Sequence, residues 1–306
     1  MINPSSNHAP DDVLAALARK PHNAVLAVIS ETTGPSYRNV GAMMAFWADG
    51  ARIGALSSGC IEDDLALHAA EVLAKGTPKA VRYGIGSPFM DMALPCGGGV
   101  EIVLFPQPSA KKIERAMALR TARQGFHLTF DRVSGEISAL TETPERSTEM
   151  LLVHIAPEVM VHIIGTGPET IALANLCHAL HYSVTVASPE LERIKPHLSP
   201  LIDATHMKHA ELPHHWKVDA RTAVVLLFHE HSWEPPILAH ALASDAFYIG
   251  ALGSLQTHQN RLKHLSELGV SGEAAARLRS PIGLIPSVRD PRSLAISVLS
   301  DIISIA

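Results

Sequence analysis

The second half of the chain opens with a strand, a glycine turn and a helix in direct succession, and this pattern constrains the fold more than any other. Residues 159–164 read VMVHII, an apolar run of strand length, and Gly165-Thr166-Gly167 follows at once. A helix is expected over about 169–180, so the segment starts a βαβ unit, which places helices on a parallel sheet. Later strands are expected at 183–187, 223–228 and 246–249. Together these elements predict a Rossmann-like, doubly wound parallel sheet.

The first half has a different pattern, in which expected strands follow one another through turns. Residues 43–47 and 51–56 flank Asp49-Gly50, a dipeptide that supplies the positive φ angles of a tight hairpin turn. Residues 24–30 form a continuous apolar run, and a helix is expected over about 61–75. This half is therefore predicted to be a mixed α/β domain.

Length and composition indicate two domains. A chain of 306 residues, of which 47% are hydrophobic, has a core too large for one small domain. The polar segment 141–148, which contains a proline, is the candidate linker. We predict an N-terminal domain over 1–145 and a Rossmann-like domain over 155–306.

Charge and cysteine content exclude several classes of partner. A net charge of -5 without a block of Lys and Arg argues against nucleic acid and membrane surfaces as partners. Neither a signal peptide nor an apolar run of about 18 residues is evident. The three cysteines, an odd number, favour free thiols in a reducing compartment, so a cytoplasmic protein is expected.

Two of the cysteines lie in glycine loops, Ser57-Ser58-Gly59-Cys60-Ile61-Glu62 and Leu94-Pro95-Cys96-Gly97-Gly98-Gly99. A thiol beside flexible, donor-rich backbone can hold a sulfur-bearing or phosphate-bearing ligand. Cys60 is expected at a helix start, where the dipole lowers a thiol pKa, but the acids at 62–64 oppose that shift, and a buried structural cysteine is the alternative. Cys96 has no acid beside it, and the three glycines after it suit a phosphate or a flat cofactor. The alternative is a tight turn that leads into the next strand, although a single glycine would usually suffice for such a turn.

The Gly165-Thr166-Gly167 turn matches the first two glycines of a dinucleotide-binding fingerprint. Its third position is Thr170, however, and the second strand lacks the acidic residue that binds a ribose, since Glu190 comes late and follows a proline. We therefore expect a Rossmann scaffold that does not use NAD. Gly253-Ser254, after a later strand, is either a second anion-binding turn or an ordinary helix cap.

Histidine is frequent, with 18 in the chain, so metal binding has to be considered. His229-Glu230-His231 ends an expected strand, and four further histidines lie within 206–215. Their spacing matches no compact metal site such as HExxH, and no third ligand follows nearby. We expect these histidines to be exposed or hydrogen-bonded.

Five short motifs are spread over nearly the whole chain. They are Gly34-Pro35-Ser36-Tyr37-Arg38, Gly54-Ala55-Leu56-Ser57-Ser58-Gly59-Cys60-Ile61-Glu62, Cys96-Gly97-Gly98, Tyr248-Ile249-Gly250-Ala251-Leu252-Gly253-Ser254 and Pro281-Ile282-Gly283-Leu284. Each motif alone is short, but in combination they resemble the XdhC/CoxI family of molybdenum-enzyme accessory proteins. The resemblance implies a cysteine-loop domain followed by a Rossmann domain.

The resemblance also implies a function. Such a protein binds the molybdenum cofactor, as molybdopterin or its cytosine dinucleotide form, and protects it while a cysteine desulfurase supplies its sulfido ligand. It then aids insertion into an apo-hydroxylase such as xanthine dehydrogenase. Cys60 and Cys96 would contact the molybdenum, since thiolates are soft ligands. The other expected cofactor contacts are Ser58, Gly59, Gly97, Gly98, Gly99, Gly165, Gly167, Gly253 and Ser254.

We expect a cofactor chaperone, present as a homodimer, the commonest oligomer, rather than an enzyme with turnover. Two other functions stay open. One is an NAD(P)-dependent oxidoreductase that uses the Rossmann domain, for which Gly165 and Gly167 would have to bind the pyrophosphate. The other is an interaction adaptor whose cysteine loops are only structural.

Overall fold

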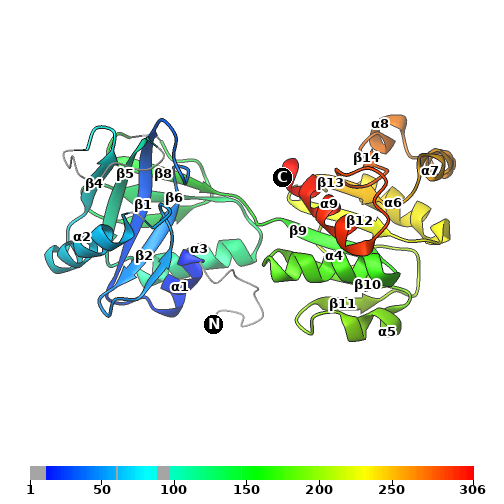
Figure 1. Cartoon of the computed structure of the whole chain (residues 1–306), viewed down its shortest axis with the longest axis horizontal. Helices are drawn as coiled ribbons and strands as arrows, with labels where there is room; N and C mark the ends of the chain where they lie inside the picture. The colour runs from blue at the N-terminus through cyan, green and yellow to red at the C-terminus, as the bar shows by residue number, and fades with distance from the viewer. Residues whose placement is uncertain (1–11, 60, 88–96, 146) are drawn as a thin grey trace. The chain divides into compact units, whose positions relative to one another are not determined.

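The computed structural model describes residues 12–59, 61–87, 97–145 and 147–306. The chain divides into two compact units, with the division between Pro157 and Glu158. The first unit contains α1 to α3 and β1 to β8, and the second runs from β9 to α9 (Figure 1).

Two antiparallel sheets make up the first unit. The five-stranded sheet has the order β3-β2-β1-β5-β4, and the three-stranded sheet has the order β7-β6-β8. The strands are β1 (Ala24–Thr33), β2 (Met43–Trp47), β3 (Arg52–Gly54), β4 (Lys79–Gly84), β5 (Gly99–Pro106), β6 (Phe126–Asp131), β7 (Ile137–Leu140) and β8 (Met150–Ile155). The helices are α1 (Val13–Arg19), α2 (Glu62–Lys75) and α3 (Ala110–Thr121). The mixed α/β character predicted for this half is confirmed, and the hairpin expected around Asp49-Gly50 is formed by β2 and β3.

The central strand β1 is buried on both faces. Val25 and Ala27 belong to the core cluster formed with α2, whereas Leu26 and Val28 belong to the cluster formed with α1, α3 and the three-stranded sheet. Alternate side chains of a strand point to opposite faces of its sheet. The continuous apolar run at 24–30 is therefore explained by a strand that is covered on both sides.

The polar segment 141–148 does not join the two units. It connects β7 to β8, and β8 pairs with β6 from Phe126 opposite Ile155 to Asp131 opposite Met150. The linker expected at 141–148 is therefore wrong. The pairing of β8 with β6 joins segments that are distant in the chain, and a polar turn between two strands has the same composition as a linker.

The second unit is a doubly wound parallel sheet with the strand order β11-β10-β9-β12-β13-β14. Its strands are β9 (Met160–Gly165), β10 (Ser183–Ser188), β11 (Asp203–His206), β12 (Thr222–Leu227), β13 (Tyr248–Ala251) and β14 (Leu278–Arg279). Every neighbouring pair is parallel. The order reverses between β9 and β12, as in a Rossmann fold. The predicted Rossmann-like half is thereby confirmed.

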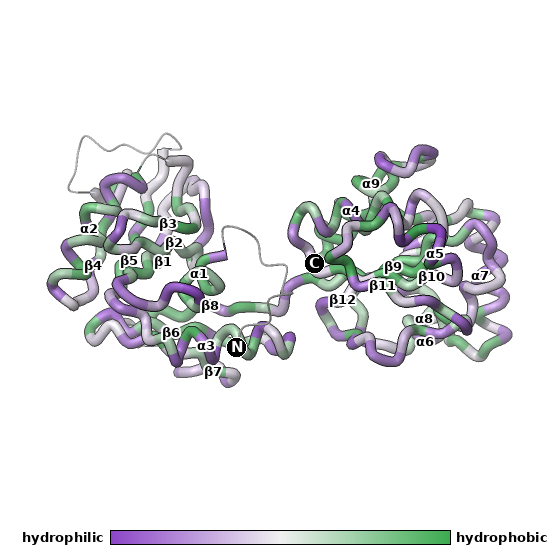
Figure 2. The backbone as a smooth tube through the Cα atoms, turned by 90° about the horizontal axis from the view of Figure 1, so that it is seen from below, coloured by the Kyte–Doolittle hydropathy of each residue, from purple (hydrophilic) through white to green (hydrophobic). Residues whose placement is uncertain are grey.

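Helices cover both faces of this sheet. The α-helices are α4 (Gly167–Ala179), α5 (Leu191–Ile194), α6 (Glu234–Leu242), α7 (Leu255–Glu267), α8 (Gly272–Ala275) and α9 (Pro291–Ser304), and the short 3-10 helices are η1 (Lys195–His197) and η2 (His231–Trp233). Leu173 of α4 and Val298 of α9 pack on one face, and Ile237 of α6 and Leu265 of α7 pack on the other. Figure 2 shows the hydrophobic strands and the largely hydrophilic α7.

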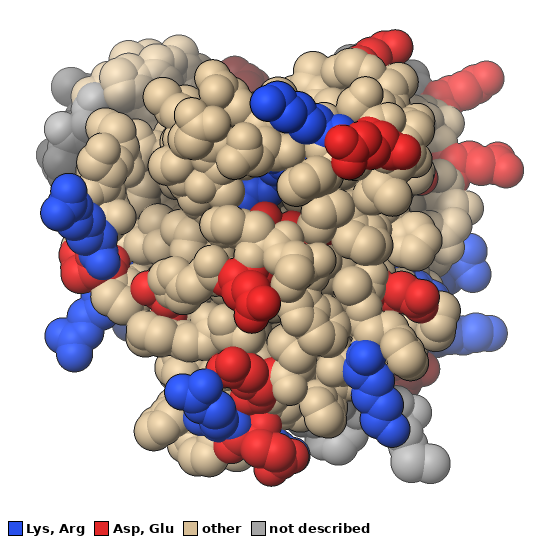
Figure 3. Space-filling model, turned by 90° about the vertical axis from the view of Figure 1, so that its right-hand side faces the viewer, with Lys and Arg blue, Asp and Glu red and all other residues tan. Residues whose placement is uncertain are grey.

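None of the helices in the described part of the chain combines the length and the apolar character that a membrane span requires. On the side of the molecule seen in Figure 3, acidic and basic side chains of the described residues are interspersed over a largely uncharged surface. This mixture of signs agrees with the small net charge of -5.

Candidate functional site

Several strand termini point to the same end of the five-stranded sheet. Thr33 at the end of β1 pairs with Gly99 at the start of β5, and Gly84 at the end of β4 pairs with Gly99 from the other side. β3 has the same direction as β1, because both are antiparallel to β2, so Gly54 at its end points the same way. We call this region the loop end, consisting of residues 33–38, 55–59, 84–86 and 97–99.

Backbone packing explains three of the glycines at the loop end, Gly84, Gly98 and Gly99. A Cβ atom on Gly98 would lie 1.8 Å from the carbonyl oxygen of Pro35, and one on Gly84 would lie 2.1 Å from the carbonyl oxygen of Gly98. A Cβ atom on Gly99 would lie 2.6 Å from the carbonyl oxygen of Ile85. Only glycine permits so close an approach. The 34–38 motif, the end of β4 and the second glycine loop therefore pack backbone against backbone.

Gly59 and Gly97 differ from these packed glycines. Their φ angles are +101° and +70°, and beyond their chain neighbours no atom of the described residues lies within 4 Å of the place a Cβ atom would take. Gly59 directly precedes Cys60 and Gly97 directly follows Cys96, while both cysteines lie outside the described residues. Open backbone thus adjoins each of the two cysteines in the sequence.

The carboxylate of Glu62 holds the first cysteine loop. Its Oε1 accepts hydrogen bonds from the backbone N–H groups of Ser57 at 2.8 Å and Leu56 at 3.2 Å. Its Oε2 accepts from the Ser57 hydroxyl at 2.6 Å and from the backbone N–H of Ile61 at 3.2 Å. Burial acts to raise the pKa of Glu62, but the hydrogen bonds from Ser57 and Ile61 outweigh it, and the pKa is lowered. Glu62 therefore fixes the conformation of the loop. From the sequence, Glu62 was considered only as one of the acids that oppose the lowering of the Cys60 pKa.

A partly buried hydrogen bond joins the first turn of α2 to the end of β4. Tyr83 Oη donates to Asp64 Oδ2 at 2.5 Å, and the Tyr83 side chain is fully buried. Burial, and then the hydrogen bond to Asp64, raise the pKa of Tyr83, so the phenol remains a donor. Gly84, which follows Tyr83, is paired with Gly99, so this contact ties the start of α2 to the strand end that packs on the second glycine loop.

Exposed groups suited to a ligand lie on the loop that packs against Gly98. Tyr37 is 63% exposed, and Arg38 is also exposed. Arg82, at the same end of the sheet, is instead occupied by the Ile85 carbonyl at 3.0 Å and the Thr33 hydroxyl at 2.8 Å. An aromatic ring can stack on a planar ligand and a guanidinium binds phosphate. From the sequence, Tyr37 and Arg38 were noted only as part of the Gly34-Pro35-Ser36-Tyr37-Arg38 motif.

In the second unit the turn after β9 is tightly packed. A Cβ atom on Gly165 would lie 2.3 Å from the carbonyl oxygen of Leu227 and 2.7 Å from Thr170 Oγ1. Thr170 is fully buried and its hydroxyl donates to the Thr166 carbonyl at 3.2 Å. Gly167, with φ +75°, begins α4. The third fingerprint position is thus filled by a threonine that packs the helix on the strands.

Glu169 supplies a negative charge in the first turn of α4. Its Oε2 lies 3.1 Å from His229 Nε2, and its side chain is 12% exposed. A helix N-terminus favours an anion, and here a carboxylate already occupies the first turn. At the end of β10, Glu190 pairs with Arg193 at 3.0 Å. The expectation that this unit does not use NAD stays a prediction, with these residues in its support.

The Gly253-Ser254 turn caps a helix. Ser254 Oγ accepts a hydrogen bond from the Thr257 backbone N–H at 3.1 Å, and a Cβ atom on Gly253 would lie 2.9 Å from Thr257 Cγ2. Gly165, Gly167, Gly253 and Ser254 all lie at the carboxyl ends of strands of the second unit, as expected, but each has a packing or capping partner or starts a helix.

Three of the histidines singled out in the sequence have acidic or carbonyl partners. His229 pairs with Glu169, and His231 Nδ1 lies 3.1 Å from Glu234 Oε2. His206 Nε2 lies 3.2 Å from the Pro189 carbonyl oxygen. Among the residues that the structure describes, no group of three or more His, Cys, Asp or Glu side chains is arranged to hold a metal ion.

Comparisons with known proteins agree with the motifs. Residues 17–84 match the family described as "XdhC and CoxI family", and residues 161–302 match "XdhC Rossmann domain". The chain is 33% identical over 284 residues to the molybdenum cofactor insertion chaperone PaoD of Escherichia coli, covering 92% of this chain and 83% of that protein. It is 25% identical to a probable xanthine dehydrogenase subunit of Bacillus subtilis, covering 95% and 96% of the two chains.

A solved structure shows the same fold. A protein described as a xanthine dehydrogenase from Bacillus halodurans superposes with a TM-score of 0.81 at 22% identity, over 97% of this chain and 96% of that one. At this identity the likeness concerns the fold alone. The two family matches and the extensive PaoD similarity determine the relationship: this chain belongs to the XdhC/CoxI family.

Proposed function

We propose that this protein binds the molybdenum cofactor and inserts it into a molybdenum enzyme. The similarity to a molybdenum cofactor insertion chaperone over most of both chains supports this function. The observation that carries it is the contrast at the loop end. Gly84, Gly98 and Gly99 are packed, whereas no described atom beyond the chain neighbours lies within 4 Å of a Cβ placed on Gly59 or Gly97, which adjoin the two cysteines in the sequence.

The chemistry of the loop end suits this cargo. Cys60 and Cys96 supply thiolates, which are soft ligands for molybdenum and also sulfur nucleophiles. The backbone near Gly97 can receive a phosphate, since peptide N–H groups in glycine loops bind anions. Tyr37 can stack on the planar pterin and Arg38 can bind the phosphate. Cys96, which lacks a neighbouring acid, is the stronger of the two thiolate candidates.

Further details belong to the same proposal. The protein protects the cofactor, in its molybdopterin or cytosine dinucleotide form, while a cysteine desulfurase installs the sulfido ligand. It then delivers the cofactor to an apo-hydroxylase of the xanthine dehydrogenase type, and acts as a homodimer in the cytoplasm. Gly165, Gly167, Gly253 and Ser254 of the second unit are weaker candidates for cofactor contacts, because the structure gives them packing and capping roles.

One experiment tests the assignment of the thiols. The purified protein is mixed with molybdenum cofactor, freed of unbound ligand and assayed for retained cofactor and for activation of an apo-hydroxylase. Cys60→Ala and Cys96→Ala should each lower retention, with the larger loss for Cys96→Ala. Cys177→Ala is the matched control, because Cys177 is buried in the second unit and should not affect retention. Retention unchanged in both test variants would refute the thiol assignment.

The same assay, repeated with NAD, distinguishes the chaperone from an NAD(P)-dependent oxidoreductase. The Rossmann strand order favours a nucleotide ligand in principle. Retention of NAD without retention of molybdenum cofactor would support an oxidoreductase and contradict the chaperone.

A further inference from the structure

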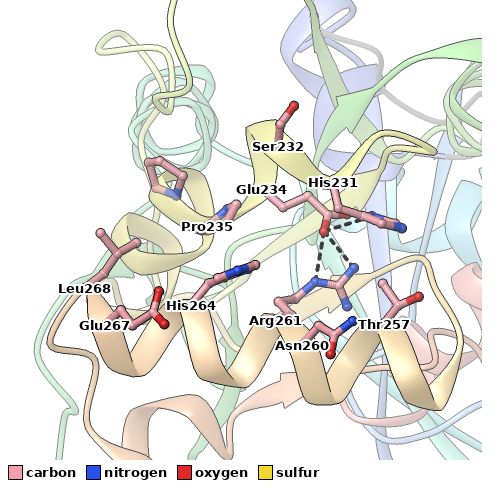
Figure 4. Close-up of a pocket in the computed structure, with 11 residues that line it drawn as sticks. His231, Ser232, Glu234, Pro235, Thr257, Asn260, Arg261, His264, Glu267 and Leu268 are labelled. Carbon is pink, nitrogen blue, oxygen red and sulfur yellow. Dashed lines mark hydrogen bonds and ion pairs between the residues drawn. The ribbon is translucent and has the colours of Figure 1, made fainter.

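A pocket of about 570 Å³ lies between α6 and α7 in the second unit. These helices follow β12 and β13, so their first turns lie at the carboxyl ends of the parallel strands, where ligands bind in open α/β sheets. The volume is in the range of small-molecule sites. Figure 4 shows side chains from both helices directed into the space between them, with Glu234 and Arg261 at its centre.

Glu234 and Arg261 form a buried ion pair that lines this pocket. Their side chains are 1% and 2% exposed. Arg261 Nε donates to Glu234 Oε2 at 2.9 Å, and Nη2 donates to the same oxygen at 2.7 Å. His231 Nδ1 lies 3.1 Å from this oxygen as well. All three nitrogen atoms therefore converge on Oε2, and the pair lacks the usual fork in which each carboxylate oxygen receives a donor.

The second carboxylate oxygen of Glu234, Oε1, takes no part in this ion pair. Oε1 is buried and has no hydrogen-bond partner among the described residues. A buried acceptor without a donor is costly, and a native structure usually supplies one from protein, water or ligand. Oε1 is therefore an unpartnered acceptor, among the described residues, directly behind the lining of the pocket, and a ligand donor reaches it when the side chains in front of it move apart.

Arg261 cannot rotate to donate a hydrogen bond to Glu234 Oε1 without losing other contacts. Its Nη1 donates to Ser280 Oγ at 2.9 Å, and its Nη2 also donates to the Leu252 carbonyl at 2.8 Å. Gly253 lies beside it, since a Cβ atom there would be 3.4 Å from Nη2. The guanidinium is thus held by the β13–α7 turn and by Ser280, and the missing donor has to come from elsewhere.

The surroundings define the chemistry of that donor. Arg261 already neutralises the charge of Glu234, so a neutral N–H is favoured over a second cation. Pro235 and Leu268 offer apolar walls, and the His264 imidazole offers a flat ring against which another ring can stack. We propose that this pocket binds a planar heterocycle with an exocyclic amino group, of the size of a nucleobase, whose amino group donates to Glu234 Oε1.

Matched ligand pairs test this proposal. Guanosine, adenosine and cytidine are titrated into the full-length protein by calorimetry, each beside the same nucleoside without its exocyclic amino group. At least one amino compound should bind with one-to-one stoichiometry. The matching nucleoside without the amino group should bind at least about tenfold more weakly, because it lacks the hydrogen bond to the charged acceptor. Absence of saturable binding by all three, or equal binding within every pair, overturns the proposal.

Two kinds of variant locate the binding. Asn260→Phe fills the pocket from the exposed surface of α7 and should abolish binding, whereas Lys263→Phe adds the same side chain at an exposed α7 position outside the pocket lining and should not. Equal affinities of these two variants would place the binding elsewhere and refute the site.

Glu234→Gln tests the acceptor itself. Because Arg261 can only donate hydrogen bonds, the side-chain oxygen of the glutamine has to face Arg261. The NH₂ group of the glutamine then takes the place of Oε1 and presents a donor to the ligand. The preference for the amino compound should therefore disappear, with the fold checked by thermal melting. If this variant does not fold, the Asn260→Phe and Lys263→Phe comparison decides the outcome. The site lies in the second unit and its test uses no molybdenum, so its failure would leave the proposed chaperone function intact.

Discussion

Tyr83 Oη donates a 2.5 Å hydrogen bond to Asp64 Oδ2, and this contact ties the first turn of α2, which follows the first cysteine loop, to the end of β4. Asp64 lies in the first turn of the helix that follows Cys60, and Tyr83 precedes Gly84, which packs on Gly98 of the second loop. The two loops are far apart in the sequence. Leu65 of α2 also packs with Tyr83 and Val100 in one core cluster, so the hydrogen bond is one of several contacts between these elements. Its loss should disturb the loop end.

Replacing Tyr83 by phenylalanine removes the hydrogen bond and leaves the buried ring in place. We expect the free energy of unfolding to fall by about 1.5 to 3 kcal/mol, because the acceptor is a charged, partly buried carboxylate. Cofactor retention should fall as well, since the loop before α2 loses its attachment. Urea denaturation and the retention assay measure the two effects.

Tyr248→Phe is the matched control. Tyr248 is also fully buried and donates to Asp301 Oδ2 at 2.9 Å, but in the second unit. It should lower stability by a similar amount and leave cofactor retention unchanged. An equal loss of retention in both variants would mean that general destabilisation, and not the loop end, accounts for the effect.

The glycines of the second loop should respond differently to alanine. In Gly98→Ala the new Cβ atom meets the Pro35 carbonyl oxygen, so the backbone has to move, at a cost of about 2 to 3 kcal/mol. In Gly97→Ala the new Cβ atom meets no atom of the described residues beyond its chain neighbours, so the unfavourable positive φ angle should dominate, at about 1 kcal/mol. Unfolding midpoints in urea distinguish the two. Equal destabilisation would contradict the packing described for Gly98.

Glu62 should make stability depend on pH in the acid range. Its folded pKa is lowered below the ordinary 4.5, so its contribution is fully present above that value and is lost as pH falls through the folded pKa. Glu62→Gln should lower the free energy of unfolding at pH 7 by about 1 to 3 kcal/mol, through weaker hydrogen bonds. The difference between the two proteins should shrink as the pH is lowered below 4.5.

Denaturation series at several pH values measure this difference directly. Other carboxylates with lowered pKa values, such as Glu101, are present in both proteins and cancel in the comparison. A gap that stays constant from neutral pH to well below 4.5 would show that the Glu62 clamp does not depend on its charge.

Arg38 should affect binding without affecting the fold. It is exposed, so Arg38→Ala should change the free energy of unfolding by no more than about 0.5 kcal/mol. Loss of a guanidinium that binds phosphate should lower cofactor affinity by about tenfold. Arg193→Ala, at a 79% exposed arginine of the second unit, serves as the control and should retain cofactor like the unaltered protein. Normal retention by Arg38→Ala would remove Arg38 from the site.

Local patterns were sufficient for much of the architecture. The VMVHII run with Gly165-Thr166-Gly167 identified β9 and the start of α4, because strand length and glycine turns are features of adjacent residues. The capping role of Ser254 was also one of the two interpretations that its sequence context allowed. The segment 141–148 was wrongly predicted to be a linker because the partner of β8 is β6, and no neighbouring residue reveals that pairing.

Sequence patterns were enough to predict the family, the Rossmann-like sheet, the mixed α/β half and the two cysteine loops as a candidate site. The folded structure was needed to tell which glycines are packed, since Gly98 meets Pro35 and Gly99 meets Ile85 through contacts between distant segments. It also shows that Glu62 clamps its loop and that a buried oxygen of Glu234, beside a pocket, has no hydrogen-bond partner among the described residues. Close approach and hydrogen-bond satisfaction depend on atoms brought together by folding from distant parts of the chain, and such distances are not encoded in any local pattern.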